Sequence, residues 1–133
     1  MRNHEDLEVW QKAHALTIKS YRMTECFPRS ELFGLTSQIR RAAGSIGANL
    51  AEGCGRWGDA ELARFVQIAM GSASELQNHF RLASDLGFLD APDYATTLKD
   101  ITSVRQMLTA FLQTFRGVRS PGKLAPRSLA NSE

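Results

Sequence analysis

Apolar side chains recur at steps of three and four residues in four long stretches of the chain, which is the period of an amphipathic α-helix. Turn-forming residues separate the stretches, and no stretch of useful length alternates as a strand does. The pattern predicts helices over about 6–25, 31–56, 59–87 and 90–116. The fold class expected is therefore all-α.

The residues between the stretches set the expected helix ends. Asp6 and Asp59 are residues that cap helix N-termini well, and they are the predicted N-caps of the first and third helices. Pro28 pushes the residue before it out of the helical region and so ends the first helix. Gly87 suits the left-handed position that closes a helix, and Pro92 fits the first turn of the fourth helix.

Short connections force neighbouring helices to run in opposite directions, so residues 1–116 are predicted to form an antiparallel up-down-up-down four-helix bundle. Residues 117–133 contain few large apolar groups and are predicted to be a flexible C-terminal tail. Cys26 and Cys54 then lie at opposite ends of the bundle, too far apart for a disulfide, and we expect free thiols.

The second and third stretches carry the clearest core stripes. Their predicted core positions are Leu32, Leu35, Ile39, Ala42, Ile46, Asn49 or Leu50, Gly53, and Leu62, Phe65 or Val66, Ala69, Ala73, Leu76, Phe80, Ala83. Gly44, Gly47 and Gly71 interrupt these helices. Because glycine inside a helix costs up to about 1 kcal/mol relative to alanine, they predict a close crossing of the two helices there.

The first and fourth stretches are apolar over a wider arc than one bundle interior uses. Val9, Leu16 and Met23 in the first stretch, and Val104, Met107 and Phe111 in the fourth, lie beside the main stripes. Since large exposed apolar patches usually mark interfaces, this surplus predicts self-association. The alternative is that the crossing angles bury more of each helix within one subunit.

A ribbon of short polar side chains follows the second stretch at steps of three and four residues. It consists of Gln38, Arg41, Ser45, Asn49 and Glu52, and the third stretch adds Ser72, Glu75 and His79. A solvated face is one interpretation. The other is a buried or interfacial network that pairs Arg41 with Glu52 or Glu75 and serves structure and assembly.

Composition narrows the chemistry. The 133 residues carry a net charge of +2, but the tail holds three basic residues and one acid, which leaves 13 of each sign in 1–116. A neutral bundle does not have the basic excess of a dedicated duplex-binding protein. Glu75 and His79 are four residues apart and lack the second Glu-x-x-His pair of a di-metal bundle. No phosphate loop or nucleophile motif is present, so no enzyme activity, metal or cofactor is expected.

A local patch could still contact nucleic acid. The candidate contacts are Arg40, Arg41, Arg56, Arg64 and Arg81, with Trp57 available to stack on a base. In an oligomer such a patch would be repeated in every subunit, and avidity would strengthen it. We expect neither a membrane span nor a signal peptide, and hence a cytoplasmic protein.

Four motifs resemble those of the 23S rRNA intervening-sequence protein family of bacterial four-helix bundles. They are DLEVWQKA at 6–13, LTSQIRRAA at 35–43, SIGANLAEG at 45–53 and the segment 65–76, within a resemblance that covers about 5–116. The residues that match the family motif are Gln38, Arg40, Arg41, Ser45, Asn49, Glu52, Gly53, Gly71, Ser72 and Glu75.

The resemblance implies a cytosolic subunit that closes into a homopentameric ring. Accessory variability proteins of diversity-generating retroelements look similar, and they associate with a reverse transcriptase and with nucleic acid. We therefore expect a non-enzymatic oligomeric helical scaffold whose partner is RNA, DNA or a nucleic-acid enzyme. The alternatives are a purely structural interaction module with no nucleic-acid role and an accessory protein to a reverse transcriptase.

Overall fold

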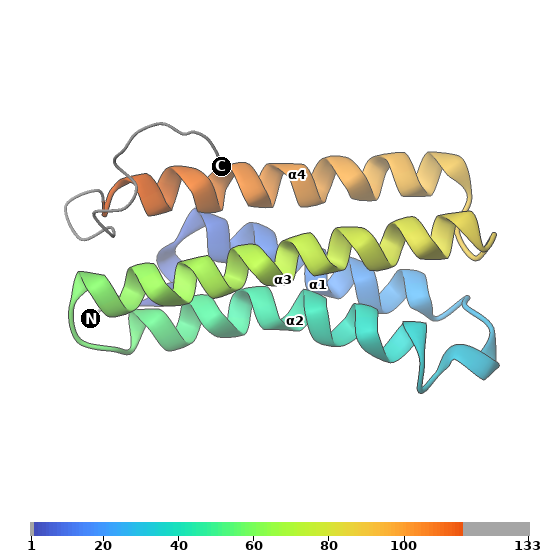
Figure 1. Ribbon diagram of the computed structural model, residues 1–133, viewed down its shortest axis with the longest axis horizontal. Helices are drawn as coiled ribbons and strands as arrows, with labels where there is room; N and C mark the ends of the chain where they lie inside the picture. Colours follow the sequence, from blue (N-terminus) through green and yellow to red (C-terminus); the bar gives the residue numbers. More distant parts are fainter. Residues whose placement is uncertain (1, 116–133) are drawn as a thin grey trace, which may run out of the picture.

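Four long helices make up the part of the chain that the computed structural model describes, residues 2–115. They are α1 (Glu8–Thr24), α2 (Leu35–Cys54), α3 (Asp59–Asp85) and α4 (Ala91–Gln113), with short 3-10 turns at His4–Asp6 and Arg29–Glu31. Figure 1 shows the helices side by side, each beginning next to the end of the one before it. The all-α four-helix class is confirmed, whereas Arg116 and the predicted tail lie outside the described residues.

The start of α2 differs from the prediction. Residue 31 belongs to a 3-10 turn, and α2 begins only at Leu35. Glu31 instead caps the helix from outside, because its Oε1 accepts a hydrogen bond of 3.0 Å from the Leu35 backbone N–H. Leu32, predicted as the first core position, is therefore outside the helix and 47% exposed.

Two predicted N-caps are wrong. Asp6 lies in the first 3-10 turn, and Leu7 occupies the N-cap of α1 without a side-chain hydrogen bond. The N-cap of α3 is Gly58, with φ of 90°, and Asp59 is the first helical residue. A left-handed backbone at this turn favours glycine, which lacks the Cβ that penalises this conformation.

Two further predictions are confirmed, the end of the third helix at Gly87 and the start of the fourth with Pro92 in its first turn. Gly87 has φ of 80°, and the N–H groups of Gly87 and Phe88 donate to the carbonyls of Ser84 (3.0 Å) and Ala83 (2.9 Å). This is the Schellman arrangement that closes a helix. At the start of α4, Asp90 accepts a hydrogen bond of 2.9 Å from the Asp93 backbone N–H.

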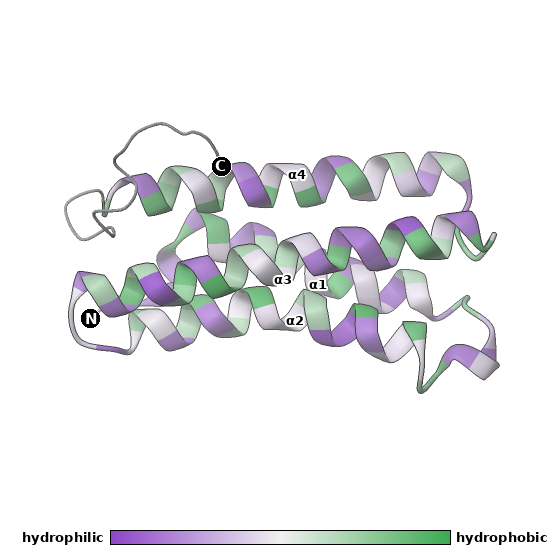
Figure 2. Ribbon diagram, viewed as in Figure 1, coloured by the Kyte–Doolittle hydropathy of each residue, from purple (hydrophilic) through white to green (hydrophobic). Residues whose placement is uncertain are grey.

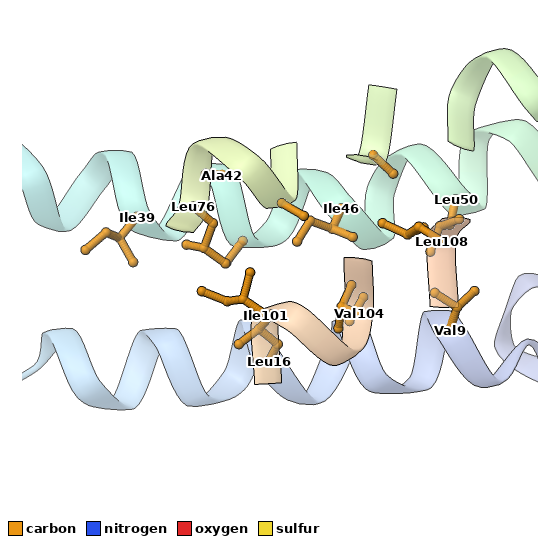
Figure 3. Packing of buried hydrophobic residues seen from close by; sticks show 14 of the residues in the cluster. Val9, Leu16, Ile39, Ala42, Ile46, Leu50, Leu76, Ile101, Val104 and Leu108 are labelled. Atoms are coloured by element: carbon orange, nitrogen blue, oxygen red, sulfur yellow. The ribbon is translucent and has the colours of Figure 1, made fainter. Parts of the chain in front are cut away.

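The core lies where the stripes of α2 and α3 meet α1 and α4. Figure 3 shows Ile39, Ile46 and Leu50 of α2 pointing toward α1 and α4. Leu76 of α3 lies between Ile39 and Ile46, and Leu108 of α4 lies beside Leu50. Apart from Leu32, and with Leu50 rather than Asn49, the predicted stripe residues are buried. Along each helix, polar and apolar bands alternate in Figure 2 as an amphipathic helix requires.

The apolar surplus expected on the first and last helices is hidden within the subunit. Val9, Leu16 and Val104 are buried in the core, and Met107 and Phe111 pack half-buried against it. Met23 does the same. The surplus is therefore accommodated by the wider burial of α1 and α4, as the alternative interpretation expected, and it gives no evidence of self-association.

α2 and α3 are in contact near the predicted crossing, where Ser45 meets Ser72, but the glycines themselves do not form this contact. A Cβ on Gly44 or on Gly71 would meet nothing within 4 Å, and one on Gly47 would approach Trp10 of α1 at 3.2 Å. The close approach of α2 and α3 lies instead at Gly53, where a Cβ would stand 2.8 Å from Phe65 Cβ and 2.9 Å from a Leu62 methyl carbon.

Both cysteines are free thiols, Cys26 exposed and Cys54 buried. Burial raises the pKa of the Cys54 thiol above its ordinary value, against a smaller lowering by the charge of Arg2. In residues 2–115, no helix is both long and apolar enough to cross a bilayer.

Candidate interaction surfaces

The centre of the predicted polar ribbon joins α2 to α3. Ser45 Oγ lies 2.9 Å from Ser72 Oγ, and the Asn49 amide donates to Ser45 Oγ (2.9 Å) and to the Ser45 carbonyl (2.8 Å). Ser72 is only 9% exposed. This Ser45–Asn49–Ser72 cluster places three of the predicted site residues in one hydrogen-bonded group.

Within the subunit, the predicted pairing of Arg41 with Glu52 or Glu75 is not formed. Glu52 bonds Arg56 at 2.8 Å, and Glu75 bonds His79 at 3.1 Å. Both pairs join residues one helical turn apart, which is the geometry most easily formed on a helix surface. The ribbon is therefore not a buried ionic network within the subunit.

An open hollow of about 200 Å³ lies between α2 and α3 beside the serine cluster. It is lined by Gln38, Arg41, Ala42, Ser45 and Glu75. Gln38, Arg41 and Glu75 are exposed around it. The charged part of the ribbon is thus available to a ligand or to another protein chain.

Small side chains continue this surface, which we call the α2–α3 face. Gly44 and Ala48 of α2 and Gly71 of α3 lie on it with open space above the glycines. Ile68 and Leu82 of α3 add exposed apolar side chains, 40% and 46% exposed. The α2–α3 face is therefore flat, partly apolar and accessible to another backbone.

Arg40, predicted as a nucleic-acid contact, ties α2 to α1. Its Nε donates to Thr24 Oγ1 at 2.8 Å, its Nη2 donates to the Tyr21 carbonyl at 3.2 Å, and its guanidinium lies 4.8 Å from the centre of the Tyr21 ring. These contacts hold Arg40 in the fold.

Arg56 and Arg64 lie at the opposite end of α2 and flank Phe65, with guanidinium carbons 5.1 and 4.5 Å from the ring centre. Each also bonds a carboxylate, Arg56 that of Glu52 and Arg64 that of Glu61. The hydrogen bond from Arg64 lowers the pKa of Glu61 below its ordinary value. The two arginines therefore provide no net positive charge at this end.

Trp57 stands out at the same end. It follows Arg56 in the turn between α2 and α3 and is 81% exposed. Arg41 lies near the start of α2, whereas Arg56 follows the end of that helix at Cys54, and the helix from Arg41 to Cys54 alone spans about 20 Å along its axis. The predicted nucleic-acid contacts are therefore not brought together as one patch.

Arg81, the remaining predicted contact, meets an arginine that the sequence patterns did not reveal. Arg81 and Arg105 line the same hollow of about 350 Å³ between α3 and α4. A hydrogen bond to Asp85 raises the pKa of Arg81 further above its ordinary value. In the sequence, Arg105 lies in a largely apolar stretch of the fourth helix and belongs to no polar pattern. In the structure it donates a hydrogen bond of 2.9 Å to Gln77 Oε1 of α3.

Within residues 2–115, no group of three or more His, Cys, Asp or Glu side chains is placed to hold a metal ion. The surfaces described above have the character of interaction sites: exposed small residues, an exposed tryptophan and a groove with two arginines. The fold and these surfaces define a helical-bundle protein whose candidate functional residues lie on its surface.

Comparison with known proteins shows the family of this chain. The sequence model described as 23S rRNA-intervening sequence protein matches residues 5–110, and the chain belongs to this family. A crystal structure of a protein of unknown function from the S23 ribosomal protein family of Bacteroides thetaiotaomicron is similar, with a TM-score of 0.74 and 21% identity. The match covers 79% of this chain and 95% of that chain. No curated protein matches.

Proposed function

We propose that this chain is the subunit of a non-enzymatic, self-associating helical scaffold in the cytoplasm. The subunit is an antiparallel up-down-up-down bundle, and the family resemblance implies a homopentameric ring. The observation that supports self-association best is the open space above Gly44 and Gly71 on the α2–α3 face.

Both glycines lower the stability of the helices that contain them. A glycine inside a helix destabilises the folded chain by roughly 0.5–1 kcal/mol relative to alanine. Because a Cβ at Gly44 or Gly71 would meet nothing in the subunit, internal packing does not require either residue. A second chain that approaches the α2–α3 face closely would require both, and the exposed Ile68 and Leu82 would be covered in the same contact.

A ring also needs a second patch, because each subunit contacts its two neighbours through different surfaces. The connection between α1 and α2 offers one. Phe33 is 94% exposed there, and Leu32 and Tyr21 are both 47% exposed. We propose that this Phe33 patch of one subunit and the α2–α3 face of the next form the repeating contact.

The test substitutes bulky residues where the subunit has room. Gly44→Gln and Gly71→Gln fit the single subunit and obstruct the α2–α3 face, so we expect them to shift the assembly toward monomer in sedimentation velocity and light scattering. Phe33→Ser should have the same effect through the second patch. Ala95→Gln, on the exposed side of α4, is the matched control.

Two results would refute this proposal. One is a wild-type chain whose mass stays at 14.7 kDa at every concentration. The other is an oligomer that keeps the same mass in the variants of both patches. Circular dichroism of each variant ensures that a loss of assembly is not a loss of the helices.

A second candidate function is contact with RNA, DNA or a nucleic-acid enzyme such as a reverse transcriptase. The observation that favours it is the exposed Trp57 beside Arg56 and Arg64, since an exposed indole can stack on an unpaired base. Trp57→Ala should weaken the binding of labelled single-stranded RNA or DNA at low salt, measured by fluorescence anisotropy. If wild-type protein binds neither RNA nor DNA at low salt, the scaffold has no direct nucleic-acid role.

A further inference from the structure

A groove runs along the side of α3 that faces α4, away from the α2–α3 face. One hollow in it, of about 350 Å³, is lined by Ser74, Gln77, Asn78, Arg81, Tyr94 and Arg105. A second hollow, of about 380 Å³, continues along α4 and shares Arg105. Apart from the two arginines, the polar side chains that line both hollows are uncharged, and we call this surface the α3–α4 groove.

Arg105 lies where the two hollows meet, and its charge is not compensated there. Its Nη1 donates to the neutral amide oxygen of Gln77 at 2.9 Å, and its Nε is buried without a hydrogen-bond partner. No Asp or Glu lines either hollow. Since buried or half-buried cations in proteins are normally paired, the groove lacks an anion that this guanidinium would favour.

Arg81 supplies a second cation in the same hollow. Its Nε bonds both carboxylate oxygens of Asp85, at 3.2 and 3.1 Å. The Asp85 side chain is 60% exposed, so this pair is screened by water and an incoming anion can compete for Arg81 at low cost. Tyr94, Asn78 and Ser74 add hydroxyl and amide donors around the two guanidinium groups.

We propose that the α3–α4 groove binds a phosphate group through Arg105, with Arg81 as the second cation. A phosphate offers more acceptor oxygens than a carboxylate and so suits a site with two guanidinium groups and several neutral donors. The phosphate is either a free phosphate or monoester, or a phosphodiester in a nucleic-acid strand. The site belongs to one subunit and does not depend on self-association.

The experiment measures phosphate binding directly. Wild-type protein is titrated with inorganic phosphate and with a nucleoside monophosphate by isothermal calorimetry, at constant ionic strength adjusted with chloride. Direct binding is needed because phosphate salts also stabilise proteins by exclusion from their surface. We expect saturable binding, which Arg105→Gln weakens at least tenfold and Arg105→Lys, which keeps the charge but not the planar fork, weakens less.

Arg22→Gln is the matched control, since it removes the same charge from an exposed position on α1. It should change the affinity less than twofold. Thermal unfolding of Arg105→Gln followed by circular dichroism shows whether the variant is folded. If Arg105→Gln is not folded, the milder variant Arg105→Lys provides the test, and it should also weaken phosphate binding.

A labelled single-stranded RNA separates the two sources of phosphate. If Arg105→Gln also weakens RNA binding and lowers the slope of log affinity against log salt by about one, the ligand is a backbone phosphate. If RNA binding is unchanged while phosphate binding is lost, the ligand is a free phosphate or monoester. The proposal is overturned if wild-type protein shows no saturable phosphate binding, or if Arg22→Gln weakens binding as much as Arg105→Gln. It is also overturned if an acidic peptide binds the groove with higher affinity than phosphate does.

Discussion

The tight contact between Gly53 of α2 and the side chains of α3 allows a quantitative test of the packing. Gly53→Ala adds a methyl group 2.8 Å from Phe65 Cβ and 2.9 Å from a Leu62 methyl carbon. Leu62 and Phe65 are both buried, and Phe65 Cβ is attached directly to the α3 backbone, so the whole helix must shift to make room. Overpacking of a buried contact costs about 1–3 kcal/mol, and an atom that cannot rotate away favours the upper part of this range.

Helix propensity acts in the opposite direction. Alanine in place of a mid-helix glycine gains roughly 1 kcal/mol, and this is the upper limit for Gly53, which lies in the last turn of α2. We therefore expect Gly53→Ala to lower the free energy of unfolding by about 2 kcal/mol. For a folded part of this length, that corresponds to a melting temperature about 8 °C lower. Gly71→Ala is the control, because its methyl group would meet nothing within 4 Å and only the propensity gain remains.

The assay is urea unfolding followed by circular dichroism, at several protein concentrations so that any contribution of assembly is visible. At the lowest concentration, Gly71→Ala should be more stable than wild type and Gly53→Ala less stable. A Gly53→Ala variant as stable as Gly71→Ala would show that α2 and α3 separate easily, and would refute the packing described here.

Three further predictions concern individual side chains. Asp90→Ala removes a side-chain cap and should cost about 1 kcal/mol of unfolding free energy, whereas Asp6→Ala, which removes no cap, should change it little in the same urea titration. Arg105→Met removes an unpartnered buried donor and should raise the unfolding free energy by roughly 1 kcal/mol, and a loss instead would show that Arg105 stabilises the fold. Cys26 should react with a thiol reagent at once and Cys54 only as the chain unfolds. The pKa of Cys54 in the folded chain lies above the ordinary value of 9.0, so its contribution to stability is present below pH 9 and is lost as pH rises further. Cys54→Ala should therefore make the free energy of unfolding above pH 9 depend less on pH. An unchanged pH dependence would contradict this.

The features that the sequence predicted correctly depend on residues close together in the chain. The stripes of α2 and α3 follow from a helical period that neighbouring residues determine. Gly87 closes α3 because the left-handed turn is local. The four-helix class follows from these features, since four amphipathic helices with short connections have few other ways to bury their apolar faces.

The features that were missed depend on competition between partners or on distant contacts. Glu52 and Glu75 were expected to bind Arg41, but each has a basic partner one turn away on its own helix. The start of α2 was misplaced because Glu31 caps it from a separate turn. Arg105 gave no pattern at all, since its uncompensated charge depends on residues of α3 that lie far away in the sequence.

The two proposed surfaces use different sides of α3. Gly71 is open to solvent and belongs to the proposed subunit contact, whereas Gln77 and Arg81 line the hollow shared with α4. We therefore expect contact between subunits through the α2–α3 face to leave the α3–α4 groove open. A ring would then carry one phosphate site in each subunit. A single phosphate meets only one site, but a strand that spans several sites binds them with an increased effective concentration. Assembly through Gly71 therefore should not alter the affinity for inorganic phosphate, and it should strengthen the affinity for a nucleic-acid strand long enough to reach a second subunit.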